Sequence, residues 1–220
     1  MGRRQQPTAR QLRLGLELRK LREAAGLKAT EAASLLGVTS VQISQTESGI
    51  SGVSGQRVRR LAANYACSDD ELIDALVAMT TDRTRGWWEE YRGQLPTPFM
   101  DLPELEHHAH FRWDVEFLHV PGLLQTADYA RSLFSYVNPE FPQSDVERWV
   151  DHRMRRRVIL ERPDPVPYEA VIHEGALRIR VGDRTTSRAQ LTRVVELSES
   201  EYVTVRVIPF DLDDFADITA

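Results

Sequence analysis

One stretch of this chain, from Gly26 to Gly49, constrains the fold more than any other. It reads GLKATEAASLLGVTSVQISQTESG. An alanine-rich helical pattern ends at Gly37, a short turn follows, and a second short helical pattern begins behind Thr39. Glycine favours the left-handed backbone that ends a helix, and threonine is a frequent N-cap. The stretch therefore predicts two short helices joined by a tight turn.

The residues on both sides extend this pair into a module of five helices. Capping patterns mark the starts of three further helices, at Thr8 with Gln11, at Ser54, and at Ser68 with Glu71. The first helix is expected over about 9–25, the second over about 29–36, and the third between Thr39 and Gly49. Hydrophobic side chains recur in each at helical spacing, which gives each helix a face to bury. Residues 1–80 are therefore predicted to form an all-α domain.

Five short helices with a tight turn between the second and the third resemble the lambda-repressor-like, XRE-type helix-turn-helix domains, over roughly residues 8–80. In that family the third helix lies in the major groove of DNA and reads bases. The resemblance thus implies a transcription regulator that binds double-stranded operator DNA. Carried over position by position, it implies groove-facing side chains at Ser40, Val41, Gln42 and Gln45, backbone-facing ones at Thr39 and Ser44, and a phosphate neighbour at Ser48.

The side-chain chemistry at these positions suits base recognition. Glutamine can pair with adenine N6 and N7, serine can serve either type of base, and valine can contact a thymine methyl group. The alternative is that these are solvated polar residues on a short helix. That alternative is stronger for Gln42, which is also the capping-box partner of Thr39.

Three further features belong to this module: an ion pair, a departure from the family at the start of the second helix, and a basic N-terminal arm. Glu47 stands where the family has an acid that pairs with an arginine of the first helix, here Arg22, and this implies a structural ion pair. Lys28 departs from the family, since Ser, Thr or Asn usually caps the second helix; Lys28 can contact a phosphate instead. A basic N-terminal arm can do the same or be a solvated tail, and its cations are Arg3, Arg4 and Arg10.

Charge divides the chain near residue 66. Residues 1–66 hold 11 Lys and Arg against 4 Asp and Glu, whereas residues 67–220 hold 17 against 29. This asymmetry suggests a basic DNA-facing module joined to an acidic module with another task, although two ordinary domains with different surfaces would give the same counts.

Cys67 is the only cysteine, so no intramolecular disulfide can form. No apolar run suits a signal peptide or a membrane span, and we expect a cytoplasmic protein, associated with the nucleoid when bound to DNA.

Residues 87–220 are predicted to form a second, α+β domain behind a polar linker at residues 81–86. Patterns typical of strands occur at 111–120, 168–173 and 203–208. Because the first domain is all-α, the fold class predicted for the whole chain is α+β.

Helix patterns alternate with these strand patterns. Thr126 is a plausible cap for one helix, and Ser144 with Glu147 predicts a long helix that ends near Glu161. A further helix is expected at 187–197, with three inward-facing side chains, Leu191, Val194 and Val195.

The second module resembles a domain of unknown function that follows the helix-turn-helix in many actinobacterial regulators described as WhiJ-like or antitoxin-like. The resemblance is carried by segments 120–131, 150–157, 173–178 and 205–210, with Val181-Gly182 and Gln190-Leu191. The resemblance covers roughly residues 86–210. It implies binding of a small acidic protein encoded nearby, of a small-molecule effector, or of both. Relatives usually continue beyond the last strand, so this chain is expected to be a C-terminally truncated or a short member.

No catalytic residues, metal or cofactors are expected. His107, His108 and His110 match no familiar spacing of metal ligands. His173 and Glu174 follow a strand, as catalytic residues often do, but no nucleophile or partner acid accompanies them.

Two other clusters leave alternatives open. The arginines within residues 153–157 can bind an anion or nucleic acid, although a solvated helix face with local ion pairs is the favoured interpretation. An aromatic cluster can line a ligand pocket, although core packing is favoured, and its members are Trp87, Trp88, Tyr91, Phe111 and Trp113.

The leading hypothesis is a homodimeric regulator, because one short helix reads few bases and paired half-sites about 34 Å apart are the usual solution. The second hypothesis is an antitoxin-like protein that sequesters a small acidic partner and uses DNA binding for autoregulation. Membrane binding and enzymatic action are not expected.

Overall fold

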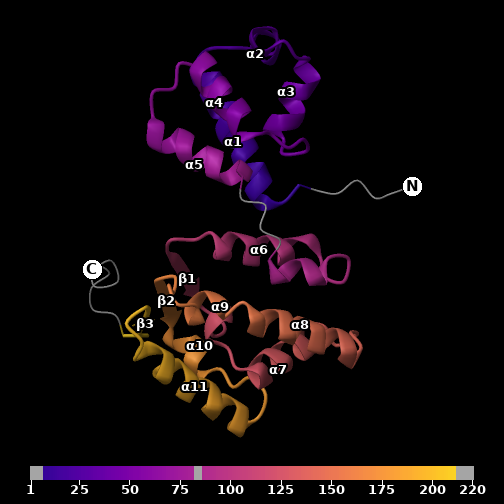
Figure 1. Ribbon diagram of the computed structural model, residues 1–220. Coiled ribbons are helices and arrows are strands. Elements are labelled where there is room, and N and C mark those ends of the chain that lie inside the picture. Colours follow the sequence, from indigo (N-terminus) through magenta and orange to yellow (C-terminus); the bar gives the residue numbers. More distant parts are fainter. Residues whose placement is uncertain (1–6, 82–85, 212–220) are drawn as a thin grey trace. The chain divides into compact units, whose positions relative to one another are not determined.

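The computed structural model describes residues 7–81 and 86–211 (Figure 1). The chain divides into two compact units, residues 1–105 and 106–220. Most of the linker expected at residues 81–86 lies outside the described residues, as do Arg3 and Arg4 of the basic arm.

The first unit is helical throughout its described part. Its elements are α1 (Ala9–Ala24), α2 (Ala29–Leu36), α3 (Ser40–Glu47), α4 (Gly55–Asn64), α5 (Asp70–Thr81), the short 3-10 helix η1 (Trp87–Tyr91), and most of α6 (Thr97–His107).

Local sequence explains where the first helices begin and end. The expected capping boxes form at α1 and α3. The hydroxyls of Thr8 and Thr39 accept from the backbone N–H three residues later, and their own backbone N–H groups donate to the glutamine side chain at that position. Gly37 ends α2 in the left-handed conformation, with φ of 67°. The cap of α5 differs from the expectation: the backbone N–H of Leu72 donates to Asp69 at 2.9 Å, so Asp69 and not Ser68 caps this helix. An ionised carboxylate is the stronger acceptor at a helix N-terminus.

All five helices from α1 through α5 contribute to the core of the first unit. It is built from aliphatic side chains of each helix, including Leu18, Leu36, Ile43, Val58, Leu61 and Leu76. Ala32 and Ala33 are buried in α2, and such small side chains allow α3 to approach closely. Packing in this core fixes the orientation of α3.

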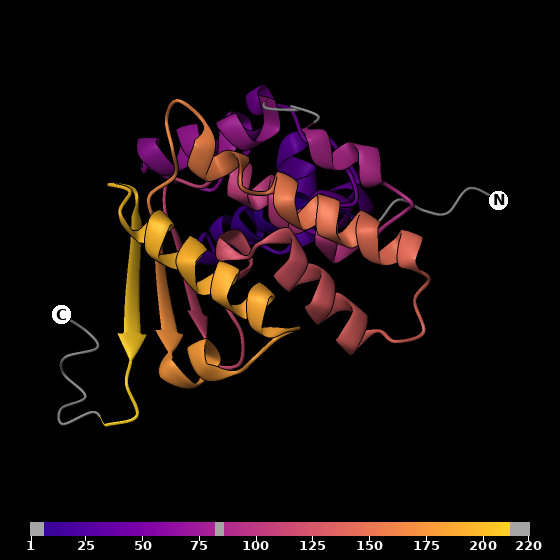
Figure 2. The same cartoon turned by 90° about the horizontal axis from the view of Figure 1, so that it is seen from below.

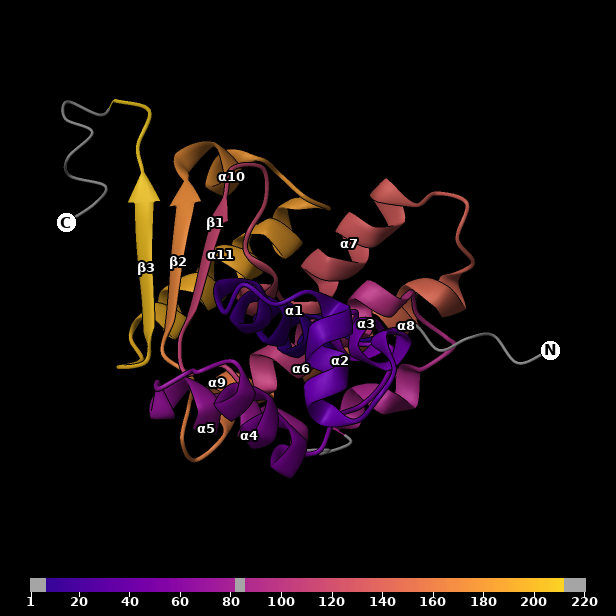
Figure 3. The ribbon, with the colours of Figure 1, turned by 90° about the horizontal axis from the view of Figure 1, so that it is seen from above.

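The second unit contains a three-stranded sheet in the order β1-β2-β3, with both pairs parallel. Its elements are β1 (Arg112–Glu116), η2 (Gly122–Leu124), α7 (Ala127–Val137), α8 (Gln143–Arg155), α9 (Val158–Glu161), β2 (Tyr168–His173), α10 (Glu174–Arg178), α11 (Arg184–Ser198) and β3 (Val203–Ile208). Parallel strands need long crossovers, and the helices lie in these connections. Figures 2 and 3 show the strands side by side with their arrows pointing the same way, and α11 crossing one face.

The α+β fold class predicted for the chain is confirmed, but two helices differ from expectation. The long helix expected from Ser144 to Glu161 is two helices, α8 and α9, with the break after Arg155. Pro142 occupies the N-cap of α8, and the Glu147 side chain accepts from Arg131 at 2.6 Å instead of closing a capping box.

Helix α11 turns a different face inward than expected. Val194 is buried, whereas Leu191 and Val195 are exposed. Gln190 takes the inward position, and its amide accepts from the backbone N–H of Thr126 at 2.7 Å and donates to the carbonyl of Leu124 at 2.8 Å. A buried glutamine with both ends satisfied cannot be recognised from a hydrophobic pattern.

Candidate nucleic-acid interface

Helix α3 has one buried face and one open face. Ile43 and Thr46 are buried, and the Thr46 hydroxyl donates to the carbonyl of Gln42 at 2.9 Å. Most of the expected DNA-facing side chains are exposed, namely those of Lys28, Thr39, Val41, Gln42, Ser44, Gln45 and Ser48, while Ser40 is half-buried. The exposed set is a row of short polar residues around Val41, whose side chain is 61% exposed.

The two glutamines of α3 differ in the hydrogen bonds of their side chains. Gln42 Oε1 accepts from the backbone N–H of Thr39 at 3.0 Å, so its carbonyl is engaged in the capping box. The side-chain amide of Gln45 makes no hydrogen bond within residues 7–81 and 86–211. Its donor and its acceptor are therefore both available to a base edge.

Arg22 and Glu47 form a buried ion pair between α1 and the end of α3. Arg22 Nε donates to Glu47 Oε1 at 2.6 Å, and Nη2 donates to Oε2 at 2.9 Å. Each side chain is 10% exposed. Hydrogen bonding to Glu47 raises the pKa of Arg22. A third donor of the guanidinium, Nη1, reaches the carbonyl of Leu27 at 2.7 Å, so the pair also holds the segment that leads into α2.

A glycine in the middle of α1 sets how closely α3 approaches. A Cβ atom at Gly15 would lie 2.4 Å from the carbonyl oxygen of Glu47 and 2.7 Å from that of Thr46. No side chain fits there unless the two helices separate. Sequence analysis did not single out Gly15, because a helical glycine gives no sign of which backbone passes beside it.

Cations lie near α2 and α4. Lys28 is exposed, and its backbone N–H donates to Glu31 at 2.6 Å at the start of α2. Arg57 and Arg60 of α4 line a hollow of about 340 Å³ beside Leu36 and Val38. Sequence analysis did not select these two arginines, and the run Arg57-Val58-Arg59-Arg60 is the signal that points to them.

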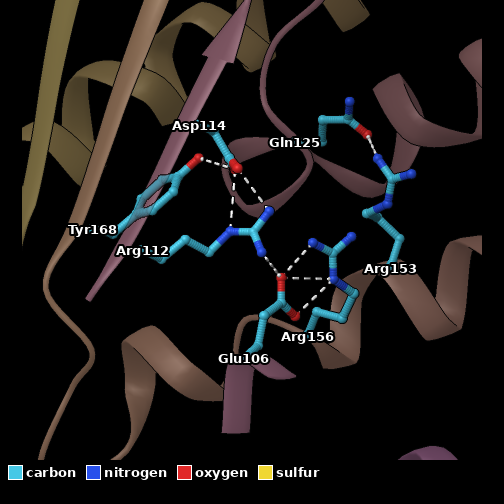
Figure 4. A network of polar contacts seen from close by, with 7 residues as sticks. All are labelled: Glu106, Arg112, Asp114, Gln125, Arg153, Arg156 and Tyr168. Atoms are coloured by element: carbon cyan, nitrogen blue, oxygen red, sulfur yellow. Dashed lines mark hydrogen bonds and ion pairs between the residues drawn. The ribbon is translucent and has the colours of Figure 1, made fainter. Parts of the chain in front are cut away.

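The second unit contains a buried polar network instead of the solvated arginine face expected at 153–157 (Figure 4). Glu106, which is 1% exposed, accepts from Arg156 at 2.6 Å and pairs with Arg112 at 2.9 Å. Arg112 also pairs with Asp114 at 2.7 Å, and the Tyr168 hydroxyl donates to the same carboxylate at 2.8 Å. Burial, together with this carboxylate, raises the pKa of Tyr168.

The network joins distant parts of the chain. Arg156, the residue that follows α8, donates to Glu106, some fifty positions earlier in the chain. Members of the expected aromatic cluster differ in burial: Trp88 and Tyr91 are buried, whereas Phe111 and Trp113 are exposed.

Other candidate sites have ordinary structural roles in the described residues. The rings of His107 and His108 pack edge to face, and no three metal-ligating side chains gather within residues 7–81 and 86–211. His173 caps α10 by accepting from Gly175 at 3.0 Å, and Glu174 accepts from the backbone of Phe210 at 2.9 Å. Across the same ranges, no helix is both long and apolar enough to cross a bilayer.

Comparison with known families agrees with this geometry. A helix-turn-helix domain family matches residues 13–76, and this match supports a DNA-binding regulator. A second family, described as a domain of unknown function (DUF5753), matches residues 99–218. Because this match covers more than half of the chain, the protein belongs to the DUF5753 family. No curated protein and no solved structure matches the chain.

Proposed function

We propose that the protein is a sequence-specific, dimeric regulator of the XRE type, in which α3 reads operator DNA and the second unit senses a small partner or ligand. The observation that carries the proposal is the open face of α3. Its polar side chains face solvent, while Ile43, Thr46 and the Arg22–Glu47 pair anchor the opposite side.

Gln45 is the base-reading residue that this geometry favours most. Its free amide can donate to and accept from adenine in the major groove, and the exposed Val41 would contact a thymine methyl group. Gln42 keeps only part of its amide free, so we assign it first to the cap of α3 and second to DNA.

Phosphate contacts would position the helix without selecting sequence. Thr39, Ser44 and Ser48 are the candidates from the resemblance, Lys28 is a candidate because it departs from the family pattern, and all four are exposed. Arg57 and Arg60 add positive charge in the same basic half of the chain. A dimer would present two α3 helices to half-sites about one turn of DNA apart.

A second candidate function is antitoxin-like sequestration of a small acidic protein. The observation in its favour is the charge of residues 1–66, with 11 cations against 4 anions, which would attract an acidic partner as well as DNA. The two ligands would then compete for one surface, and DNA binding would provide autoregulation.

The test is a gel-shift titration with the DNA upstream of the protein's own gene and with scrambled DNA of equal length. We expect specific binding, and we expect Gln45→Ala to weaken it by about ten- to a hundredfold, because one bidentate base contact is lost. The melting temperature should stay unchanged, since the Gln45 side chain is exposed.

Gln143→Ala is the matched control, because it removes another exposed glutamine side chain from α8 and should leave DNA binding unchanged. Equal affinity for the two DNAs at low salt would reject the regulator proposal. A large loss of thermal stability in Gln45→Ala would assign that residue to the fold instead.

A further inference from the structure

The second unit contains a small pocket bordered by η2, α7 and α8. Its volume is about 280 Å³, near the lower limit for sites of small molecules. One wall is apolar and consists of Leu133, Phe134, Val137 and Trp149. The rings of Phe134 and Trp149 meet edge to face with their centroids 5.4 Å apart, which gives this wall a fixed shape.

Arg153 brings a positive charge to this apolar wall. Its guanidinium lies 4.9 Å from the centre of the Phe134 ring, and Nη1 donates to Gln125 Oε1 at 2.7 Å. Gln125 is buried and is itself held by donating to the carbonyl of Val120 at 2.7 Å. Arg153 is therefore positioned by a neutral amide and an aromatic ring.

Arg153 has no carboxylate partner among the residues that the structure describes, in contrast to its neighbours (Figure 4). Arg112 and Arg156 are balanced by Glu106 and Asp114, two cations for two anions. Arg153 is half-buried, and burial lowers its pKa to about 10. A partly desolvated guanidinium with no ion-paired carboxylate can pair with the carboxylate of a ligand.

Three other polar side chains line the pocket: Glu116, His119 and Asn138. The closest side-chain atoms of Glu116 and His119, Oε2 and Nδ1, are 3.3 Å apart. The Glu116 side chain is 33% exposed, so water screens its charge. Glu116 is therefore a screened anion in the neighbourhood of Arg153 and forms no ion pair with it among the described residues.

We propose that this pocket binds a small organic carboxylate with an aromatic or aliphatic body. The carboxylate would take the free Nε and Nη2 donors of Arg153 in a two-point pairing, and the body would lie against Phe134 and Trp149. Gly122 leaves room for the guanidinium, since a Cβ there would lie 2.9 Å from Nη1. Carboxylate binding by the second unit would be regulatory only if the proposed function holds.

The test is a ligand titration of the full chain in the absence of DNA, by calorimetry and by thermal shift. The probes are phenylacetate and hexanoate, each paired with its neutral amide. We expect the carboxylates to bind and to raise the melting temperature, and the amides to bind about ten- to a hundredfold more weakly, because a charged hydrogen bond is replaced by a neutral one.

Arg153→Met should abolish the preference for carboxylates. It should keep or raise the melting temperature of the free protein, because an uncompensated charge is replaced by an apolar side chain. Arg148→Gln is the matched control, since Arg148 lies on the same helix, pairs with Asp145 at 2.7 Å and does not line the pocket. A second variant, Val137→Trp, fills the pocket from an exposed position and should block binding with Arg153 in place.

Two results would overturn the inference: failure of both carboxylates to bind at millimolar concentration, or equal binding by wild type and Arg153→Met. A clear drop in melting temperature for Arg153→Met would assign Arg153 a structural role and count against it as well. None of these results involves DNA, so the operator proposal is tested independently by the gel shift.

Discussion

At the scale of single residues, α3 separates residues that hold the fold from residues that are free to read DNA. Glu47 is nearly enclosed and shares two hydrogen bonds with Arg22, whereas Gln45, two positions away, is exposed with its amide free. Loss of DNA binding therefore has two possible origins in this helix, and stability measurements distinguish them.

Glu47→Ala is expected to destabilise the protein by about 3–5 kcal/mol, because it leaves the Arg22 guanidinium buried without its counter-charge. Urea unfolding followed by circular dichroism measures this change. Asp74→Ala is the control: Asp74 and its partner Arg59 are both more than half exposed, and such a surface pair contributes less than about 1 kcal/mol. Similar losses for the two variants would contradict the structural role given to Glu47.

At the scale of elements, the contact between α1 and α3 depends on a missing side chain. Gly15→Ala should raise helix propensity by about 1 kcal/mol, yet we expect a net loss of stability, because the new methyl group meets the carbonyl of Glu47 at 2.4 Å. The melting temperature and the affinity for DNA in the gel shift should both fall, since α3 is displaced. Gly52→Ala, where nothing lies within 4 Å of the added Cβ, should be tolerated. A more stable Gly15→Ala protein would show that the helices separate at little cost.

The elements that sequence predicts best are those with local causes. Thr39 and Gln42 start α3 through a capping box, and Gly37 ends α2 through its backbone freedom, so a few neighbouring residues suffice. The burial of the Arg156 side chain has a distant cause, its pairing with Glu106. The same limit applies to sites. The exposure of Gln45 follows from helical spacing. The lack of an ion-paired carboxylate at Arg153 depends on the pairing of Glu106 and Asp114 with other arginines, which the sequence does not reveal.

At the scale of the whole molecule, net positive charge is found in residues 1–66, the part that faces DNA in our proposal. Binding should weaken steeply with salt, because each phosphate contact releases a counterion. Lys28→Gln should lower the slope of log affinity against log salt by about one per protomer and leave sequence preference unchanged. Lys20→Gln is the control, since Lys20 lies on α1 and pairs with Glu17 at 3.0 Å. An altered sequence preference in Lys28→Gln would contradict a phosphate contact.

The parallel sheet of the second unit has a consequence for the order in which the chain matures. Its strands pair across long separations, Arg112 with Tyr168 and Tyr168 with Val203, whereas the helices of the first unit pack on near neighbours in sequence. Non-local pairing slows folding, and the N-terminal half leaves the ribosome first. We expect refolding in which helical signal returns before the fluorescence of Trp149, which lies in α8. A newly made chain would then present α3 before it has a pocket, so for a short time each molecule could occupy DNA while unable to respond to a ligand.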